Sequence, residues 1–275
     1  MSTLTVSPRT KSPVVSSVRP GRRPFRLARH SLALMKRSLI KTYRTPEALI
    51  DVTLQPVLFL VIFVYIFGGA VAGSTHDYLQ FLLPGILAQT IATGCIAIGV
   101  NLNTDIAKGI FDRFRSLPVP RVAPLLGAVL GDVVRYVIVT VVTLGIGYVM
   151  GFRITTNPFS AIAGALLAVL FAVCLSWMSV WVGMKVRTPG AVQGVMFALI
   201  MPLSFASNVF VDTSTLPGWM QGFVAVNPLT HLVGAVRGLF LGSPLGNHVW
   251  WTLAWCAGFV IVFLPLALRA YRKRV

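Results

Sequence analysis

Acidic residues are scarce in this chain. Only seven of the 275 residues are Asp or Glu, against 24 Lys and Arg, and Glu47 is the single glutamate. The phosphate-binding pattern G-x-x-x-x-G-K-[ST] is missing, and no Ser–His–Asp grouping stands out. A site that hydrolyses a nucleotide cannot be assembled from so few carboxylates without that loop. These absences favour a passage or binding body over an enzyme, and any ATP-hydrolysing site would have to belong to another chain.

Cysteine and histidine are also too few and too scattered for a metal centre. Cys95, Cys174 and Cys256 each lie inside an apolar run, with no second Cys or His at ligand spacing, and are interpreted as small buried hydrophobic residues. The four histidines are far apart in the sequence. We therefore predict no metal site and no cofactor held by this chain.

Charge of either sign is low, and apolar residues are abundant. Charged residues make up 11% of the chain and hydrophobic residues 56%, whereas a soluble domain carries about 25% charged residues. Several apolar runs have the length of a membrane helix, and the alternating pattern of an outer-membrane barrel is missing. The sequence predicts an all-α integral membrane protein. A net charge of +17 does not indicate nucleic acid here, because the cations flank apolar runs.

The N-terminal region has two parts. Residues 1–24 are rich in Ser, Thr, Pro and Arg without an apolar core, which predicts a disordered tail rather than a signal peptide. Residues 25–45 place apolar and basic side chains on separate helical faces, which predicts an amphipathic helix lying in the membrane interface. A soluble helix packed on a partner is the alternative. The remainder, 25–275, forms one transmembrane domain.

Six spans are predicted, and the basic residues orient them. The expected spans are approximately 48–69, 79–103, 122–151, 159–184, 190–211 and 249–268. Eleven Lys and Arg precede the first span, four lie between the second and third, two between the fourth and fifth, and four after the sixth. Only Arg153 and Arg237 lie on the other side. The positive-inside rule then places both termini in the cytoplasm.

A short charged segment, DIAKGIFDRFRSLPVPR, lies between the second and third spans. Its apolar residues recur at helical spacing, Asp105 could cap a helix start, and Pro118 prevents continuation. This pattern predicts an amphipathic helix over 105–117. An ordinary cytoplasmic loop is the alternative.

Two charges fall inside the third predicted span. Asp132 and Arg135 are three residues apart, so they can pair on one helix face, and Asp51 is a second candidate partner for Arg135. Each charge at bilayer depth costs about 3 kcal/mol, so such residues usually pair or face water. A structural ion pair is preferred over a gate or substrate contact. Three glycine pairs, Gly127/Gly131, Gly147/Gly151 and Gly190/Gly194, predict close helix approach.

The segment 212–248 is only half apolar, and prolines and glycines divide it into pieces too short to cross a bilayer. Its aromatic residues suit an interface position. We predict a re-entrant or outer-leaflet helical hairpin, with a plain exterior loop as the alternative. The candidate residues of this hairpin are Pro217, Gly218, Trp219, Asn227, Pro228 and Arg237.

The segment GIFDRFRSLPVPR resembles the signature of ABC-2 type permeases, and in particular the daunorubicin-resistance membrane subunit family. The resemblance continues through GDVVRYVIVTVVTLGIGYVMGFR and SNVFVDTSTLPGWMQGFVAVNPLTHLVGAVRGLFLG, and it covers most of the chain from about Phe25 onward. It implies six spans after an interfacial helix, with a re-entrant hairpin before the last span. Asp105 and Asp112 stand where the wider superfamily commonly has a Glu pair.

The resemblance also implies that 105–117 is a coupling helix that docks on a separate cytoplasmic ATPase subunit. On this resemblance, the residues that would touch or shape the contact with the ATPase subunit are Gly109, Asp112, Arg113, Phe114, Arg115, Leu117 and Pro118. The implied complex has two ATPase subunits, which bind ATP and Mg, and a second permease chain, identical or different. It would export hydrophobic drugs from a bacterial inner membrane.

Other functions stay open at this stage. Relatives that move lipids or glycolipids are an alternative, and so is a membrane anchor for a cytoplasmic ATPase that transports nothing. A secondary transporter is less favoured, because it would expect inverted repeats and acidic relay residues at mid-membrane.

Overall fold

The computed structural model describes residues 46–110 and 123–274, and every regular element in these two stretches is a helix, as predicted. The predicted tail 1–24 and interfacial helix 25–45 lie outside them. The elements are α2 (Pro46–Ala72), α3 (Thr75–Gly94), α4 (Ile96–Ala107), α6 (Ala123–Met150), α7 (Pro158–Lys185), α8 (Pro189–Phe205), a 3-10 turn (Thr213–Thr215), α9 (Gly218–Val226), α10 (Pro228–Leu241) and α11 (His248–Arg274).

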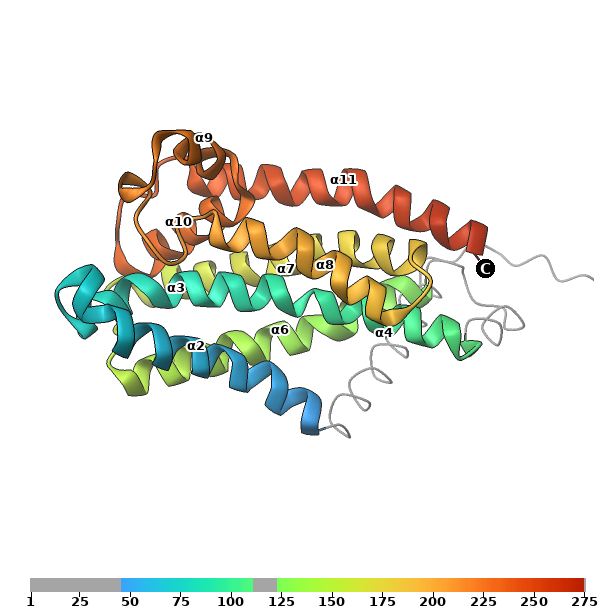
Figure 1. The fold of residues 1–275 in the computed structure, drawn as a ribbon, viewed down its shortest axis with the longest axis horizontal. Helices are drawn as coiled ribbons and strands as arrows, with labels where there is room; N and C mark the ends of the chain where they lie inside the picture. The colour runs from blue at the N-terminus through green and yellow to red at the C-terminus, as the bar shows by residue number, and fades with distance from the viewer. Residues whose placement is uncertain (1–45, 111–122, 275) are drawn as a thin grey trace, which may run out of the picture.

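The long helices lie side by side along the long axis of the molecule (Figure 1). One end carries the short helices α9 and α10 together with the connections α2–α3 and α6–α7 (Figure 1). The opposite end carries the end of α4, the turn between α7 and α8, and the C-terminus (Figure 1). We call these the hairpin end and the C-terminal end.

Four helical stretches in the described residues are long and apolar enough to cross a membrane: Thr75–Ala107, Leu125–Met150, Pro158–Lys185 and His248–Arg274. The pair α9 and α10, bent by 75°, would be a fifth if it counted as one span. Shorter apolar helices cover Leu54–Gly69 and Pro189–Phe205. The protein is therefore a multi-pass membrane protein.

Two span boundaries differ from the prediction. The second span, predicted over 79–103, extends over 75–107 and is interrupted at Cys95, whose N–H bonds Ala92 O at 3.2 Å. The fifth, predicted over 190–211, ends at Phe205. Asn227 Nδ2 donates to Leu203 O at 2.7 Å and Ala206 O at 2.6 Å, so a side chain from outside the helix satisfies its last carbonyls.

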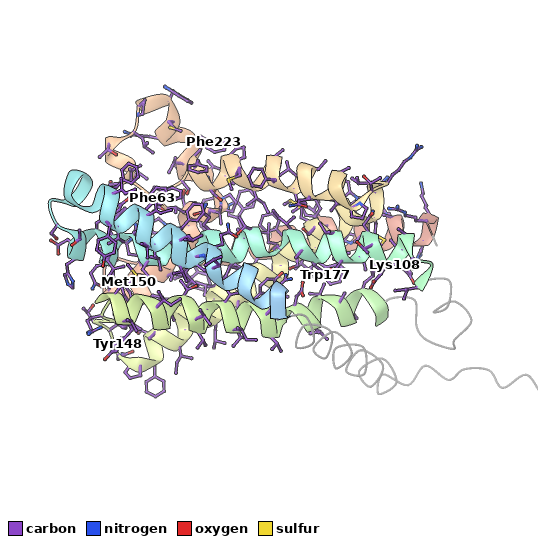
Figure 2. All side chains as sticks on the ribbon, turned by 60° about the horizontal axis from the view of Figure 1, so that its bottom comes forward. Phe63, Lys108, Tyr148, Met150, Trp177 and Phe223 are labelled. Atoms are coloured by element: carbon purple, nitrogen blue, oxygen red, sulfur yellow. The ribbon has the colours of Figure 1, made fainter. Side chains whose placement is uncertain are left out.

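The interior divides into two apolar clusters. The larger one contains α3, α7 and α10 side chains such as Leu82, Phe171 and Leu232. The smaller one, around Trp177 and Tyr271, joins α4, α6, α7 and α11. Figure 2 shows Trp177 inside the bundle, with Lys108 at the C-terminal end and Tyr148, Met150 and Phe223 at the hairpin end. Both ends of the bundle therefore have a packed core.

The predicted glycine contacts are only partly correct. Gly147 lies directly against the Leu83 side chain of α3, so a larger residue there would collide. A Cβ at Gly190 or Gly194 would meet nothing within 4 Å among the described residues, so that pair mediates no contact between the helices in 46–110 and 123–274. Contacts with backbone atoms occur at Gly85 and Gly99, where a Cβ would lie 2.5 Å from Val209 O and 2.6 Å from Ser179 O.

Candidate functional site

The segment predicted to couple to a partner begins differently from expectation. Asp105 lies in the last turn of α4 and does not start a separate helix. The helix ends at Ala107, and Gly109 has a φ of +68°, a left-handed conformation that favours glycine. The predicted start at Asp105 is therefore wrong, because α4 continues through it. Lys108 is exposed at this point.

The other predicted coupling residues lie outside the described stretches, within 111–122. They are Asp112, Arg113, Phe114, Arg115, Leu117 and Pro118. Their proposed role stays a prediction. What the structure provides is the position of their attachment, since α4 delivers the chain to the C-terminal end of the bundle (Figure 1).

Asp132 and Arg135 are both buried in α6. Arg135 Nη2 lies 3.0 Å from Asp132 Oδ2, and their side chains are 10% and 11% exposed. The same Nη2 donates to Gly94 O at 2.7 Å. Gly94 is the last residue of α3, where the interruption at Cys95 separates α3 from α4. The pair therefore has a partner on another span. The side chain of Asp51, the alternative partner of Arg135, is not among those described.

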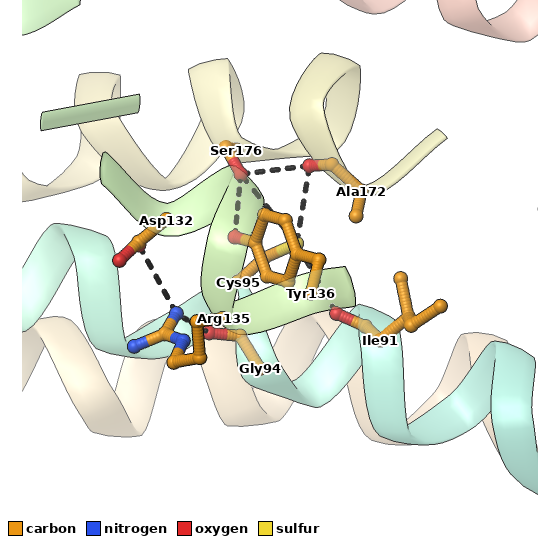
Figure 3. Close-up of polar contacts among 8 residues, drawn as sticks. All are labelled: Ile91, Gly94, Cys95, Asp132, Arg135, Tyr136, Ala172 and Ser176. Atoms are coloured by element: carbon orange, nitrogen blue, oxygen red, sulfur yellow. Dashed lines mark hydrogen bonds and ion pairs between the residues drawn. The ribbon is translucent and has the colours of Figure 1, made fainter. Parts of the chain in front are cut away.

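A wider polar network surrounds this pair (Figure 3). Tyr136 OH and Ser176 Oγ are 2.7 Å apart, and Ser176 Oγ donates to Ala172 O at 2.7 Å. Cys95 Sγ donates to Ala172 O and to Ile91 O, each at 3.3 Å. The network joins the end of α3, α6 and α7, and it surrounds the interruption between α3 and α4.

Sequence reasoning missed most of this network. Tyr136 directly follows Arg135 in an apolar run, and Ser176 lies in a predicted span without charged residues. Neither residue is marked in the sequence as part of a polar network. Cys95 was expected to be a small buried hydrophobic residue; it is buried, and it also donates hydrogen bonds. Only the charges could have signalled the position, because burying them requires partners nearby.

The segment of the predicted hairpin contains two helices, α9 and α10, which are bent by 75° relative to each other. Trp219 is 79% and Phe223 50% exposed, one helical turn apart on α9. Asn227 ends α9 and caps α10, accepting from Leu229 N at 2.9 Å. Pro217 precedes α9 at Gly218, and Pro228 opens α10, where its missing N–H costs nothing. The segment is therefore not a plain loop.

Arg237 fixes this hairpin to the bundle. Its Nη2 donates to Phe81 O at 3.0 Å and Asn208 O at 3.2 Å, and its Cζ lies 3.8 Å from the centre of the Phe81 ring. A second contact joins α10 to α11, where His231 Nδ1 and His248 Nδ1 are 3.2 Å apart. Gly234 leaves room for His248, since a Cβ there would lie 2.8 Å from its ring.

No group of three or more His, Cys, Asp or Glu residues within 46–110 and 123–274 is arranged to hold a metal ion. What the described side chains form instead are connections between spans and the hairpin.

Comparison with known proteins places the chain. Residues 29–241 match the family described as ABC-2 type transporter. The chain is 39% identical to the daunorubicin resistance ABC transporter permease protein of Streptomyces coeruleorubidus, over 98% of this chain and 99% of that protein. It is 28% identical to a probable doxorubicin resistance ABC transporter permease of Mycobacterium tuberculosis over 88% of each chain, and 26% identical to an inner membrane transport permease of Escherichia coli over 78% of this chain and 83% of that one. The family matches most of the length of this chain, and several helices of the chain are apolar enough to span a bilayer. The chain therefore belongs to the ABC-2 type transporters as a membrane permease subunit.

Proposed function

We propose that this protein is the permease subunit of an ATP-driven exporter that moves hydrophobic drugs, including anthracycline-like antibiotics, out across a bacterial inner membrane. One observation carries the substrate class: 39% identity over nearly the full length of both chains to a permease named for daunorubicin resistance. The match leaves no large region of either chain unaligned.

The proposed topology has six spans, formed by α2, α3 with α4, α6, α7, α8 and α11, with both termini in the cytoplasm. The exposed cations support this orientation. Lys108, Lys185, Arg187, Arg272 and Lys273 gather at the C-terminal end, which becomes the cytoplasmic end under the positive-inside rule. The inner membrane follows from the similarity to the permease of Escherichia coli that carries this location in its name.

The proposed partner is a cytoplasmic ATPase subunit, present twice, which binds ATP and Mg. Its docking point on this chain is the segment containing Gly109 to Pro118, attached to α4. A second permease chain would complete the membrane body. The exposed apolar side chains of α2, among them Leu58, Ile62 and Ile66, suit lipid or that second chain.

The mechanism follows from the positions of these parts. Closure of the ATPase dimer on ATP would push the segment after α4, and a two-state bundle would respond by switching the side to which its passage opens. The drug would enter from the cytoplasm or the inner leaflet. The hairpin α9–α10 lies at the opposite end, where it would open or close the exit.

The test is co-purification with the ATPase subunit and daunorubicin export in the same cells. We expect Phe114→Ala to weaken ATPase binding by about 2 kcal/mol or more, since an aromatic anchor often dominates such a contact. Arg115→Glu should weaken it by charge reversal. Normal complexes and normal export in both variants would contradict the coupling role.

The same experiment separates the alternatives. ATPase activity stimulated by a lipid and not by daunorubicin would identify a lipid exporter. A stable complex whose ATPase activity responds to no substrate would identify a membrane anchor.

A further inference from the structure

The cytoplasmic ends of three spans meet at one group of backbone carbonyls. These are Gly183 O, Met184 O and Val186 O, at the end of α7, where the last carbonyls of a helix have no partner within it. They carry the negative end of the α7 dipole. Side chains from α4 and α11 reach the same carbonyls.

From α4, Asn103 reaches two of them. Its Nδ2 donates to Gly183 O at 2.9 Å and to Val186 O at 2.7 Å, and the residue is 0% exposed. Two carbonyl acceptors fix the amide orientation, because the amide oxygen could not donate to them. Asn103 lies one turn before the end of α4, four residues from Ala107.

From α11, Arg274 reaches all three. Its Nη1 lies 3.1 Å from Gly183 O, 2.8 Å from Met184 O and 2.7 Å from Val186 O. A cation at this place also complements the α7 dipole. Gly183 O and Val186 O are therefore shared by donors from two different spans.

Beneath these bonds, the backbones of α4 and α7 touch. A Cβ at Gly183 would lie 2.6 Å from Gly99 O, and a Cβ at Gly99 would lie 2.6 Å from Ser179 O. Such close contact resists sliding, because no flexible side chain lies between the two backbones. The α4–α7 contact at Gly99 thus begins one turn before the hydrogen bonds of Asn103.

We propose that Asn103 and Arg274 are positioning residues that join the cytoplasmic ends of α4, α7 and α11 into one rigid unit. When the segment after α4 moves, this unit makes α7 and α11 move together with α4, so that the movement does not simply bend α4. The inference rests on the proposed coupling role of that segment. The interruption at Cys95, further along the same span, then marks where this unit ends.

The first experiment measures rigidity in the purified permease without ATPase or drug. Nitroxide labels at Ala107 and Lys185, both exposed, report the separation of the ends of α4 and α7. We expect a narrow distance distribution in the parent protein and a broadened one in Asn103→Leu, which keeps the side-chain size but removes the donors. Asn101→Leu, the same change on an exposed position of α4, is the matched control and should leave the distribution narrow.

The second experiment measures coupling in vesicles that contain the permease and its ATPase subunit. Asn103→Leu removes two buried hydrogen bonds, to Gly183 O and Val186 O, that stabilise the rigid unit. We expect it to reduce the amount of daunorubicin transported per ATP hydrolysed by about tenfold. Complex formation between the variant permease and its ATPase subunit should persist, which a permease that merely unfolds would not show. Asn101→Leu should transport normally.

Should Asn103→Leu fail to fold, Arg274→Ala tests the same unit from a partly exposed position, with Arg269→Ala, an exposed position of α11, as its control. A narrow distribution and normal transport per ATP in Asn103→Leu, or in Arg274→Ala where it replaces that variant, would overturn the inference while leaving the exporter assignment intact. If the parent permease binds no ATPase or moves no drug, the proposed function fails instead, and the label distances still decide whether the rigid unit exists.

Discussion

At each end of the bundle, an arginine side chain donates hydrogen bonds to backbone carbonyls, but the surroundings of the two arginines differ. At the hairpin end, the Arg237 guanidinium is partly buried and donates to carbonyls of Phe81 and Asn208. At the C-terminal end, the Arg274 guanidinium, which is also partly buried, donates to three carbonyls at the end of α7. Arg274 directly follows the exposed Arg272 and Lys273 in the sequence. Both arginines donate to backbone carbonyls of other elements.

The difference lies in what surrounds each arginine. At the hairpin end, Asn227 satisfies the last carbonyls of α8, and aromatic residues such as Trp219 and Trp250 are exposed. The C-terminal end presents cations. One end is therefore suited to lipid at the interface, and the other to an anionic or acidic partner.

The largest effect is expected between the two ends, at the charged pair. Asp132→Asn leaves Arg135 buried without its counter-charge and should cost about 4 kcal/mol of stability. The double change Asp132→Asn with Arg135→Gln should recover much of this, though not the bond to Gly94 O. Yield and thermal unfolding in detergent measure it. Two single variants that fold normally but export nothing would show a functional role instead.

At the hairpin end, Arg237→Ala should cost about 3 kcal/mol, because it removes two hydrogen bonds from a cation to backbone carbonyls and the contact with the Phe81 ring. Arg153→Ala, at the same end but exposed, is the matched control and should cost less than about 1 kcal/mol. Thermal unfolding compares the two. Equal losses would mean that burial does not distinguish these arginines.

At the C-terminal end, Gly183→Ala should cost about 2 kcal/mol through collision with Gly99 O. Gly190→Ala, which meets open space in α8, should be neutral or slightly stabilising. The unfolding temperatures of both variants measure the contrast. A harmless Gly183→Ala would show that α4 and α7 separate easily, against the proposed rigid unit.

The smallest effect on stability is expected for the exposed cations. Arg272→Ala should change stability by less than about 0.5 kcal/mol. If these cations meet an acidic partner, replacing Arg272 and Lys273 together with Ala should weaken ATPase binding at low salt, and the difference from the parent protein should shrink as salt is raised. Binding that is unchanged at every salt concentration would assign these cations to membrane orientation alone.

The hydrophobic runs predicted the helices well, because a segment of about 20 apolar residues has few stable alternatives in a bilayer. Ends were less predictable. α8 stops at Phe205 because Asn227, 24 residues away from Leu203, binds its last carbonyls. α4 runs through Asp105 because an acidic residue suitable for capping does not have to cap when the helix already continues.

The charged pair could be located from the sequence, but its partner on α3 could not. Asp132 and Arg135 are local neighbours, so helical spacing alone brings them together. Gly94 O, 41 residues away, becomes available only because the helix is interrupted at Cys95. The glycine pairs illustrate the same limit, since spacing of four occurs at Gly190 and Gly194 without any contact.

By itself, the sequence determined the membrane class, the helical content, the hairpin and the family, because hydropathy, turn residues and motifs are local properties of the chain. Tertiary structure alone decided which carbonyls meet which donors: Gly94 with Arg135, Phe81 with Arg237, and the end of α7 with Asn103 and Arg274. Every residue carries a backbone carbonyl, so the sequence does not mark the ones that lose their helical partner. Only the packing of the spans brings a donor to them.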